Sequence, residues 1–246
     1  MIYFLSDSHL GSLLEQDPRS HEMKLVRWLD MVKKDAEKIY LLGDIFDFWF
    51  EYKAVVPKGY VRVLGKLAEL VDSGIEIHFF IGNHDLWTFG YLESEIGLIV
   101  HRKSYIVELQ GKRFFMAHGD GLVKSNMGFN FLRGIFHSKL LQSLFGIFPP
   151  YIGQWLGYNW SKKNREKIMS EDNTYKGENN EELVVFAKNY SEKPDIDYFV
   201  FGHRHIDLNL KLGNGSHIII LGDFVNIFSY GVFDGTDFTL EYFEKD

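Results

Sequence analysis

The chain has 246 residues, of which 46% are hydrophobic and 16% aromatic, enough to bury the core of one large domain or two small ones. Acidic side chains outnumber basic ones by 34 to 27, and the resulting net charge of -7 argues against a general nucleic-acid-binding protein. The absence of cysteine excludes disulfide bonds and thiolate metal sites, so any metal ion must be held by oxygen and nitrogen ligands.

The N-terminus enters an apolar run at residues 2–5 and reaches Asp7 almost at once. This leaves no room for the basic region, apolar region and cleavage site of a signal peptide, so we expect a cytoplasmic protein. The longest apolar stretch, residues 140–156, is interrupted by polar residues and prolines and is shorter than the roughly 20 residues of a spanning helix. We therefore expect no transmembrane segment.

In the first half of the chain, short apolar runs alternate with segments of helical periodicity, which predicts strand-helix-strand units. We expect strands at residues 2–5, 39–42 and 75–81, and helices at residues 21–34 and 60–71. The units together predict an α/β fold.

The second half shows two hairpin signals, at Gln110-Gly111-Lys112 between strands 106–109 and 113–117, and at Asp234-Gly235 within residues 233–238. A helix at residues 181–190 precedes two further strands, which are separated by the turn signal Gly213-Asn214-Gly215 and are expected at residues 198–201 and 217–221. The sheets are therefore predicted to be mixed.

Side chains that bind metals follow five of the apolar runs directly. They are Asp7 with His9, then Asp44, then Asn83 with His84, then His118, and finally His203 with His205. Any one pair alone is more often structural, but five clusters at strand ends predict a single site, because α/β sheets bind ligands there. Seven candidate ligands suit two ions, and a set of imidazole, carboxylate and carboxamide groups favours Mn²⁺, Fe or Zn²⁺ over Ca²⁺.

Five strings occur in the order typical of one family: Asp7-Ser8-His9, Gly43-Asp44-x-x-Asp47, Gly82-Asn83-His84-Asp85, His118-Gly119-Asp120 and Gly202-His203-Arg204-His205. They resemble the motifs of the calcineurin-like metallophosphoesterases. The resemblance implies a four-layer sandwich, in which two mixed sheets are flanked by helices, and two divalent ions, expected to be Mn²⁺ with Fe or Zn²⁺ as alternatives. It assigns Asp7, His9, Asp44 and His205 to one ion and Asp44, Asn83, His118 and His203 to the other, so Asp44 would bridge them.

We interpret His84 as a catalytic residue rather than a ligand, because its neighbour Asn83 already faces the ions. It would hydrogen-bond the substrate phosphate and stabilise developing charge or protonate the leaving oxygen. Asp47, Asp85 and Asp120 are expected to orient the imidazole rings of the ligands. The alternative for these three carboxylates is the capping of loops or helix starts.

Residues 121–165 contain six basic, nine aromatic and no acidic residues. We predict that residues 121–170 form a helical cap inserted into a core made of residues 1–120 and 171–246. Apolar residues between 129 and 148 fall into two helical stripes, one at 129, 132, 136, 140, 144 and 147 and the other at 131, 135, 141, 145 and 148. One stripe is expected to pack on the core. The second stripe suits either a buried or dimer contact or, as we favour, acyl chains and an anionic membrane surface.

With the cap included, the chain is similar to the family of UDP-2,3-diacylglucosamine pyrophosphatases of lipid A biosynthesis. This implies hydrolysis of the pyrophosphate bond to UMP and 2,3-diacylglucosamine 1-phosphate (lipid X) by a cytoplasmic enzyme peripheral to the inner face of the membrane. The implied substrate contacts are Asn83, His84, Asn126, Ser161, Asn164, Lys167 and His203. Many family members have arginine where this chain has His84.

Two other functions are left open by the sequence. One is a calcineurin-like phosphatase or phosphodiesterase that acts on a soluble nucleotide or phosphoprotein, with a purely structural cap. The other is a non-catalytic scaffold with the same fold, which the complete ligand set argues against. No nucleic-acid partner is expected, and an oligomer is possible.

Overall fold

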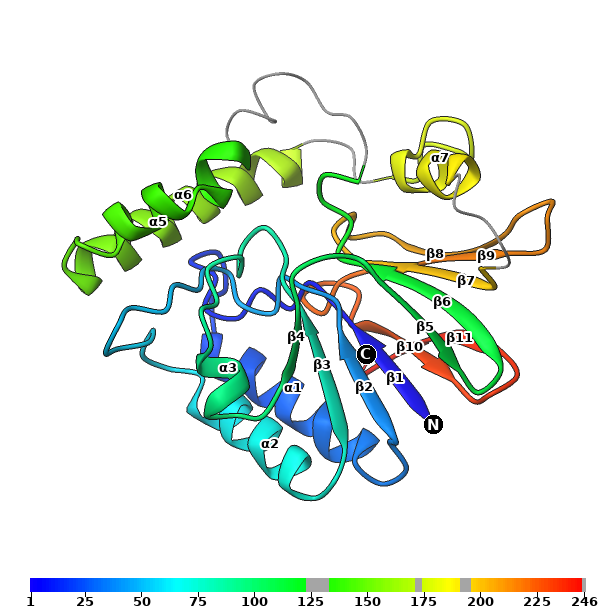
Figure 1. Cartoon of the computed structure of the whole chain (residues 1–246), viewed down its shortest axis with the longest axis horizontal. Coiled ribbons are helices and arrows are strands. Elements are labelled where there is room, and N and C mark those ends of the chain that lie inside the picture. Colours follow the sequence, from blue (N-terminus) through cyan, green and yellow to red (C-terminus); the bar gives the residue numbers. More distant parts are fainter. Residues whose placement is uncertain (123–132, 171–173, 191–195, 245–246) are drawn as a thin grey trace.

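The structure is a computed structural model that describes residues 1–122, 133–170, 174–190 and 196–244, with side chains throughout these ranges except at residues 167–170. Two β-sheets pack face to face, and helices cover both outer faces (Figure 1). This arrangement confirms the predicted four-layer α/β sandwich of two mixed sheets.

The first sheet has the strand order β11-β10-β1-β2-β3-β4. Its strands are β1 (Ile2–Leu5), β2 (Lys38–Leu41), β3 (Glu76–Phe80), β4 (Ile99–His101), β10 (Ser229–Phe233) and β11 (Phe238–Tyr242). Strands β1 to β4 run parallel, whereas β10 and β11 form an antiparallel edge. The parallel strands are almost continuously apolar because both of their faces are buried.

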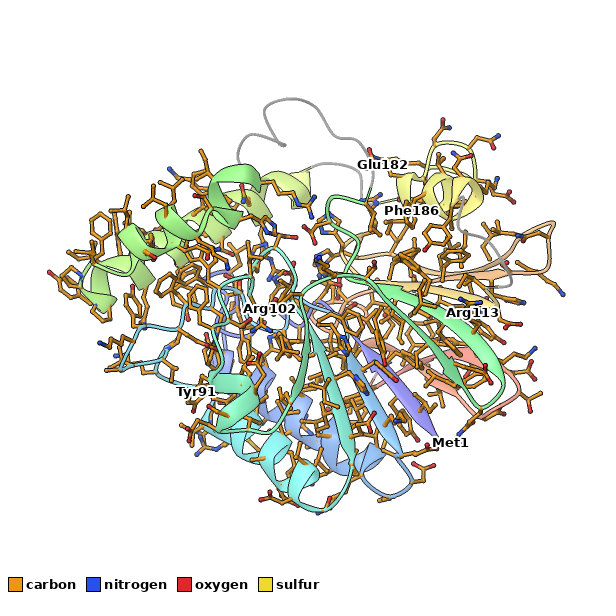
Figure 2. The ribbon with its side chains drawn as sticks, in the orientation of Figure 1. Met1, Tyr91, Arg102, Arg113, Glu182 and Phe186 are labelled. Atoms are coloured by element: carbon orange, nitrogen blue, oxygen red, sulfur yellow. The ribbon has the colours of Figure 1, made fainter. Side chains whose placement is uncertain are left out.

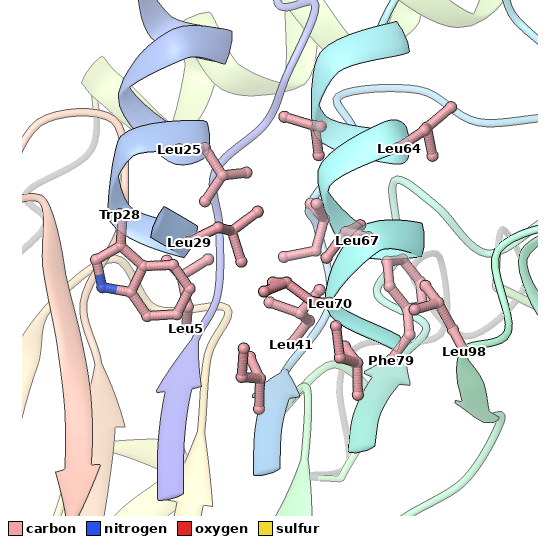
Figure 3. Packing of buried hydrophobic residues seen from close by; sticks show 14 of the residues in the cluster. Leu5, Leu25, Trp28, Leu29, Leu41, Leu64, Leu67, Leu70, Phe79 and Leu98 are labelled. Atoms are coloured by element: carbon pink, nitrogen blue, oxygen red, sulfur yellow. The ribbon is translucent and has the colours of Figure 1, made fainter. Parts of the chain in front are cut away.

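Helices α1 (Pro18–Val32) and α2 (Val61–Asp72) cover the outer face of this sheet, and the short α3 (Tyr91–Ser94) precedes β4. Helix α1 begins where the Asp17 carboxylate accepts a hydrogen bond from the Ser20 N–H. Figure 3 shows the buried side chains of both helices directed toward β1, β2 and β3, among them Leu25, Trp28, Leu29, Leu67 and Leu70. Each fully buried leucine contributes about 1.5–3 kcal/mol, so the helices hold the strand ends in place.

The second sheet has the order β5-β6-β7-β9-β8. Its strands are β5 (Tyr105–Leu109), β6 (Lys112–Ala117), β7 (Tyr198–Phe201), β8 (Asp207–Lys211) and β9 (His217–Leu221). The three central strands β6, β7 and β9 are parallel, and both edge strands are antiparallel. Helix α7 (Glu182–Asn189) covers the outer face, with Phe186 toward the sheet and Glu182 toward solvent (Figure 2).

The predicted hairpin between β5 and β6 is confirmed, since Leu109 pairs with Lys112 across the two-residue turn Gln110-Gly111. Both turn residues have positive φ, 49° and 81°, as this tight turn requires. The hairpin at Asp234-Gly235 is confirmed in the same way by the pairing of Phe233 with Phe238.

Two strands, β4 and β8, were not predicted. The turn at Gly213-Asn214-Gly215 lies between strands 198–201 and 217–221, as predicted, and it joins the unpredicted β8 to β9. Strand β8 is an edge strand in which exposed and half-buried residues alternate, so it has no apolar run to reveal it. Strand β4 has only three residues.

Helices α5 (Lys139–Phe145) and α6 (Pro150–Ser170) lie together beside the core (Figure 1). They pack on core aromatics, since the Phe145 ring lies 4.8 Å from Trp87 and 5.0 Å from Phe50, and the Tyr158 hydroxyl is 2.6 Å from that of Tyr60. Of the helices in the described ranges, none combines the length and apolar character that a membrane span requires.

The two predicted stripes do not belong to one continuous helix. Residues 133–137 are helical, but the chain leaves the helix at Ser138, whose hydroxyl accepts a hydrogen bond from the Leu141 N–H and starts α5. This break resets the helical phase, so Phe136 and Phe145, from different stripes, both pack on Trp87. The stripe positions at 129, 131 and 132 lie outside the described residues.

Candidate metal centre

Six of the seven predicted ligands, all except Asn83, meet at one end of the sandwich. Asp7 and His9 follow β1, Asp44 follows β2, His118 follows β6, and His203 with His205 follows β7. The carboxyl ends of the central strands of both sheets thus face one site, although the two ligand-bearing halves are far apart in sequence.

One group of ligand atoms consists of Asp7, His9 and His205, which lie within 4.8 Å of one another. His9 Nε2 is 3.3 Å from His205 Nε2, and Asp7 Oδ1 is 3.7 Å and 3.4 Å from these two nitrogens. A carboxylate oxygen and two imidazole nitrogens that converge in this way form a nitrogen- and oxygen-rich site for one transition-metal ion.

A second group consists of Asp44, His118 and His203, within the same distance of one another. Asp44 Oδ2 lies 3.3 Å from His118 Nε2 and 3.9 Å from His9 Nε2, so this oxygen is placed between the two groups. Asp44 is therefore in the position of a bridging carboxylate.

The imidazole rings are oriented by acceptors on their far sides. His118 Nδ1 donates to the Leu42 carbonyl oxygen at 2.7 Å, and His205 Nδ1 donates to Asp223 Oδ2 at 3.3 Å. Since each proton is on Nδ1, each Nε2 lone pair is directed into the site and is free to bind a metal.

Buried polar atoms without hydrogen-bond partners indicate that the two groups of ligand atoms bind cations. Asp7 Oδ1 and His118 Nε2 are buried and have no hydrogen-bond partner among the described residues. Buried polar atoms without a partner are costly, and this cost is removed when they bind a cation. The donor set and its orientation therefore fit two divalent ions.

His84 lies next to both groups, with its ring edge against the His9 ring at a centroid distance of 4.8 Å. Its Nδ1 donates to the Asp47 carbonyl oxygen at 2.8 Å, and its backbone N–H donates to Asp44 Oδ1 at 2.8 Å. Burial lowers the pKa of His84 below its usual value. His84, His9 and Asp44 also lie within 4.8 Å of one another, so binding of an ion by His84 is geometrically possible as well.

Five predicted ligands have positive φ angles, which non-glycine residues rarely adopt: Asp7 (54°), His9 (43°), Asp44 (53°), His203 (68°) and His205 (51°). This conformation costs free energy and persists where the surrounding structure enforces it. The concentration of strained backbone at the ligands is typical of a functional site.

Gly82 allows the loop after β3 to approach Asp44 closely. A Cβ atom at this position would lie 2.1 Å from Asp44 Oδ1. We expect Gly82→Ala to displace this carboxylate and to lower kcat by about 10²-fold, since small misplacements of reacting groups have effects of this size. Phosphoesterase assays with purified variants measure the effect.

Gly65→Ala in α2 is the matched control, because its Cβ would meet no atom within 4 Å. It is expected to retain activity and to gain roughly 1 kcal/mol of helix stability. Full activity in Gly82→Ala would contradict the role assigned to this contact.

The three carboxylates expected to orient imidazoles differ in what they contact. Asp47 Oδ1 lies 3.5 Å from His9 Nδ1, which has no hydrogen-bond partner among the described residues, so the orienting role of Asp47 stays a prediction. Asp85 instead accepts hydrogen bonds from the backbone N–H groups of Gly82 and Ile45, at 2.7 Å and 2.8 Å, and so ties two loops together. This is the loop-capping alternative.

Asp120 forms an ion pair with Arg133, with 3.6 Å between Oδ2 and Nε, rather than a hydrogen bond to an imidazole within the described structure. Like Asp85, it departs from the expected orienting role. Their motifs place Asp85 and Asp120 next to predicted ligands in the sequence. In the folded loops, however, the two carboxylates contact backbone N–H groups and Arg133 instead of imidazole rings.

Asp223 was missed by the sequence analysis although it orients His205. Burial alone would raise the pKa of Asp223, but the hydrogen bond and charge of His205, with backbone N–H donors, hold it below its usual value. The signal was present, because Asp223 follows an apolar strand and a glycine, as Asp44 does. Arg204 and buried Glu181 form a second missed pair, at 2.7 Å, that links the last motif to the start of α7.

The predicted substrate residues are only partly described. Ser161 of α6 is buried beside His84, 3.1 Å from its Nδ1, whereas Asn164 and Asn83 are exposed. Asn126 lies outside the described residues, as does the side chain of Lys167.

The family model of the calcineurin-like phosphoesterases matches residues 1–207. A Porphyromonas gingivalis protein named UDP-2,3-diacylglucosamine hydrolase is 42% identical over 99% of this chain and 97% of its own length, and a Histophilus somni protein of the same name is 28% identical over 82% and 83%.

A solved structure of a dimetal phosphatase from Danio rerio covers 99% of this chain and 98% of its own at 13% identity. Its TM-score of 0.44 is too low to support an argument about this chain. The family match and the 42% identical relative confirm the resemblance seen in the five motifs. The chain therefore belongs to the calcineurin-like phosphoesterase family and is a hydrolase.

Proposed function

We propose that this protein hydrolyses the pyrophosphate bond of UDP-2,3-diacylglucosamine. Water would attack the α-phosphorus, the bond from that phosphorus to the bridging oxygen would break, and UMP and 2,3-diacylglucosamine 1-phosphate would leave. The observation that supports this substrate most strongly is the near full-length match, at 42% identity, to the Porphyromonas gingivalis protein named for it.

The proposed metal centre uses all seven predicted ligands. Asp7, His9, Asp44 and His205 would hold one ion, and Asp44, Asn83, His118 and His203 the other, with Mn²⁺ expected ahead of Fe or Zn²⁺. When bound, the two ions would activate water and neutralise phosphate charge. The two converging groups that share access to Asp44 support this division.

His84 is proposed to contact the phosphate through Nε2, since the Asp47 carbonyl oxygen already engages Nδ1. Asn83, Asn126, Ser161, Asn164, Lys167 and His203 are proposed as the further substrate contacts. Positioning and electrostatic stabilisation dominate phosphoryl transfer, so a ring fixed by two neighbours suits this role.

Residues 121–170 are proposed to act as the cap that accepts the acyl chains. A groove of about 940 Å³ lies between α5 and the loop at residues 50–56, and its size is typical of ligand pockets. Its lining is mixed, with apolar residues such as Phe50, Val56, Phe89 and Ile147 and charged residues such as Glu51, Lys53, Glu95 and Lys139. None of its lining residues is a candidate metal ligand. It would therefore receive the apolar part of a substrate rather than the pyrophosphate.

Many large apolar side chains of α5 and α6 are exposed to solvent. The exposed large apolar residues described there are Leu140, Leu141, Leu144, Ile147, Phe148, Tyr151, Trp155, Leu156 and Trp160. Exposed apolar patches of this kind mark interaction sites, and the basic side chains among them suit an anionic bilayer. We propose that the protein binds the inner face of the cytoplasmic membrane through this surface.

The double variant Ile147→Glu, Trp155→Glu is expected to bind vesicles that contain phosphatidylglycerol at least about 10-fold more weakly. The two side chains are 77% and 64% exposed, and burial of each in lipid contributes about 1.5–3 kcal/mol. Vesicle co-sedimentation measures the loss. Val61→Glu, at a 72% exposed position on α2, is the control and should bind the vesicles as wild type does. Equal vesicle binding by the double variant and by Val61→Glu would contradict the proposed membrane-binding surface.

The substrate proposal is tested with purified Mn²⁺-loaded protein and UDP-2,3-diacylglucosamine, with UMP release followed by chromatography. Release of UMP is expected. If no UMP forms while soluble phosphodiesters are cleaved well, the lipid substrate is wrong and a soluble one must be sought. A protein that binds no metal would instead favour a non-catalytic scaffold.

A further inference from the structure

Asp47 lies between a candidate metal ligand and the cap. Its carboxylate is fully buried, and each oxygen faces a different set of groups. Oδ2 accepts a hydrogen bond from Ser161 Oγ at 2.7 Å, whereas Oδ1 is 3.3 Å from Arg165 Nη1 and 3.5 Å from His9 Nδ1. One side chain therefore contacts both α6 and the metal centre.

The two α6 residues occupy one face of the helix. Ser161 and Arg165 are four residues apart and are 2% and 7% exposed, whereas Lys163 between them is exposed. One turn earlier, the Tyr158 hydroxyl bonds to that of Tyr60, and a Cβ at Gly157 would collide with the Phe48 ring. Close contacts along this face thus fix the distance between α6 and the loop that carries Asp47.

The role of Asp47 depends on its charge and orientation. An imidazole that binds metal through Nε2 must keep its proton on Nδ1, and Asp47 Oδ1 lies 3.5 Å from His9 Nδ1, a charge contact rather than a formed hydrogen bond. A buried carboxylate is stable only when it is paired, and the guanidinium of Arg165 supplies the charge while Ser161 holds the second oxygen. Removal of Arg165 would leave Asp47 free to turn away from His9.

We propose that Arg165 is a positioning residue, which with Ser161 holds Asp47 against His9 and so links docking of the cap to metal binding at the His9 site. The inference rests on the proposed metal centre and not on the identity of the substrate. Because linkage between two binding events is reciprocal, metal would also stabilise the docked position of α6.

The experiment compares metal-free wild type, Arg165→Met, Arg165→Lys and Lys163→Met. Calorimetric titration with Mn²⁺ gives the affinity, and hydrogen exchange of residues 150–166 with and without Mn²⁺ reports on cap docking. In Arg165→Met we expect one Mn²⁺ site to weaken by about 10- to 100-fold, the size typical for residues that orient ligands, and the Mn²⁺-dependent protection of α6 to disappear.

Arg165→Lys should recover part of both effects, and Lys163→Met, on the exposed face of the same helix, should match wild type. Should Arg165→Met fail to fold, Ser161→Ala serves instead, with a smaller loss of Mn²⁺ affinity expected. Unchanged Mn²⁺ affinity in the variants, with only turnover reduced, would overturn the inference and assign Arg165 to the substrate. Absence of Mn²⁺ binding by wild type would overturn the proposed metal centre itself.

Discussion

Asp44→Asn is expected to lower kcat/KM by at least about 10³-fold and to reduce the amount of bound Mn²⁺. Asp44 Oδ2 lies between His118 Nε2 and His9 Nε2, at 3.3 Å and 3.9 Å, so its charge serves both groups of ligands. A neutral carboxamide removes that charge, and a loss of several kcal/mol in transition-state stabilisation corresponds to this factor. Steady-state kinetics and elemental analysis of the purified variant measure the two effects.

Asp72→Asn, at the exposed C-terminal end of α2, is the control for the loss of one carboxylate. It should match wild type in kinetics and metal content. Two bound Mn²⁺ ions and near wild-type turnover in Asp44→Asn would show that Asp44 does not bridge the ions.

His84→Ala is expected to lower kcat by about 10²- to 10³-fold, the effect typical of removing one group that stabilises transition-state charge. The ring is held by the Asp47 carbonyl oxygen and lies beside Ser161 Oγ, so it has a defined orientation before substrate binds. Metal content is the decisive second measurement. Two retained Mn²⁺ ions are expected if His84 contacts phosphate.

A fall in Mn²⁺ content in His84→Ala would identify His84 as a ligand, which its position near His9 and Asp44 also allows. His217→Gln provides the control, because this imidazole, at the start of β9, contacts Asn209 of the neighbouring strand. Loss of a histidine there should leave turnover unchanged.

The side chains that converge at the candidate metal centre could be predicted from the sequence because the signal is local. Each ligand follows an apolar strand within a few residues, and a strand that is buried on both faces reads as a continuous apolar run, as in β1 and β7. The boundaries of those two strands were predicted without error. Edge strands such as β8 were missed because half of their residues face solvent.

Which group each of the three motif carboxylates contacts could be read only from the folded chain. Asp47, Asp85 and Asp120 look alike in their motifs, yet one faces His9, one accepts backbone N–H groups and one pairs with Arg133. The direction of a side chain in a loop is set by φ and ψ angles that short motifs do not encode. The sequence analysis also did not identify Asp223, whose carboxylate contacts His205 Nδ1 in the folded chain.

By itself, the sequence determined the α/β class, the candidate ligands and the unusual composition of residues 121–165. Only the tertiary structure decided that Asp44 lies between two ligand groups, that Arg165 reaches Asp47, and which apolar residues of the cap face solvent. The contact of Arg165 with Asp47, for example, joins segments more than 100 residues apart in the chain. Ser161 and Arg165 are 114 and 118 positions away from Asp47. Such contacts follow from how helices and sheets pack, which local periodicity does not specify.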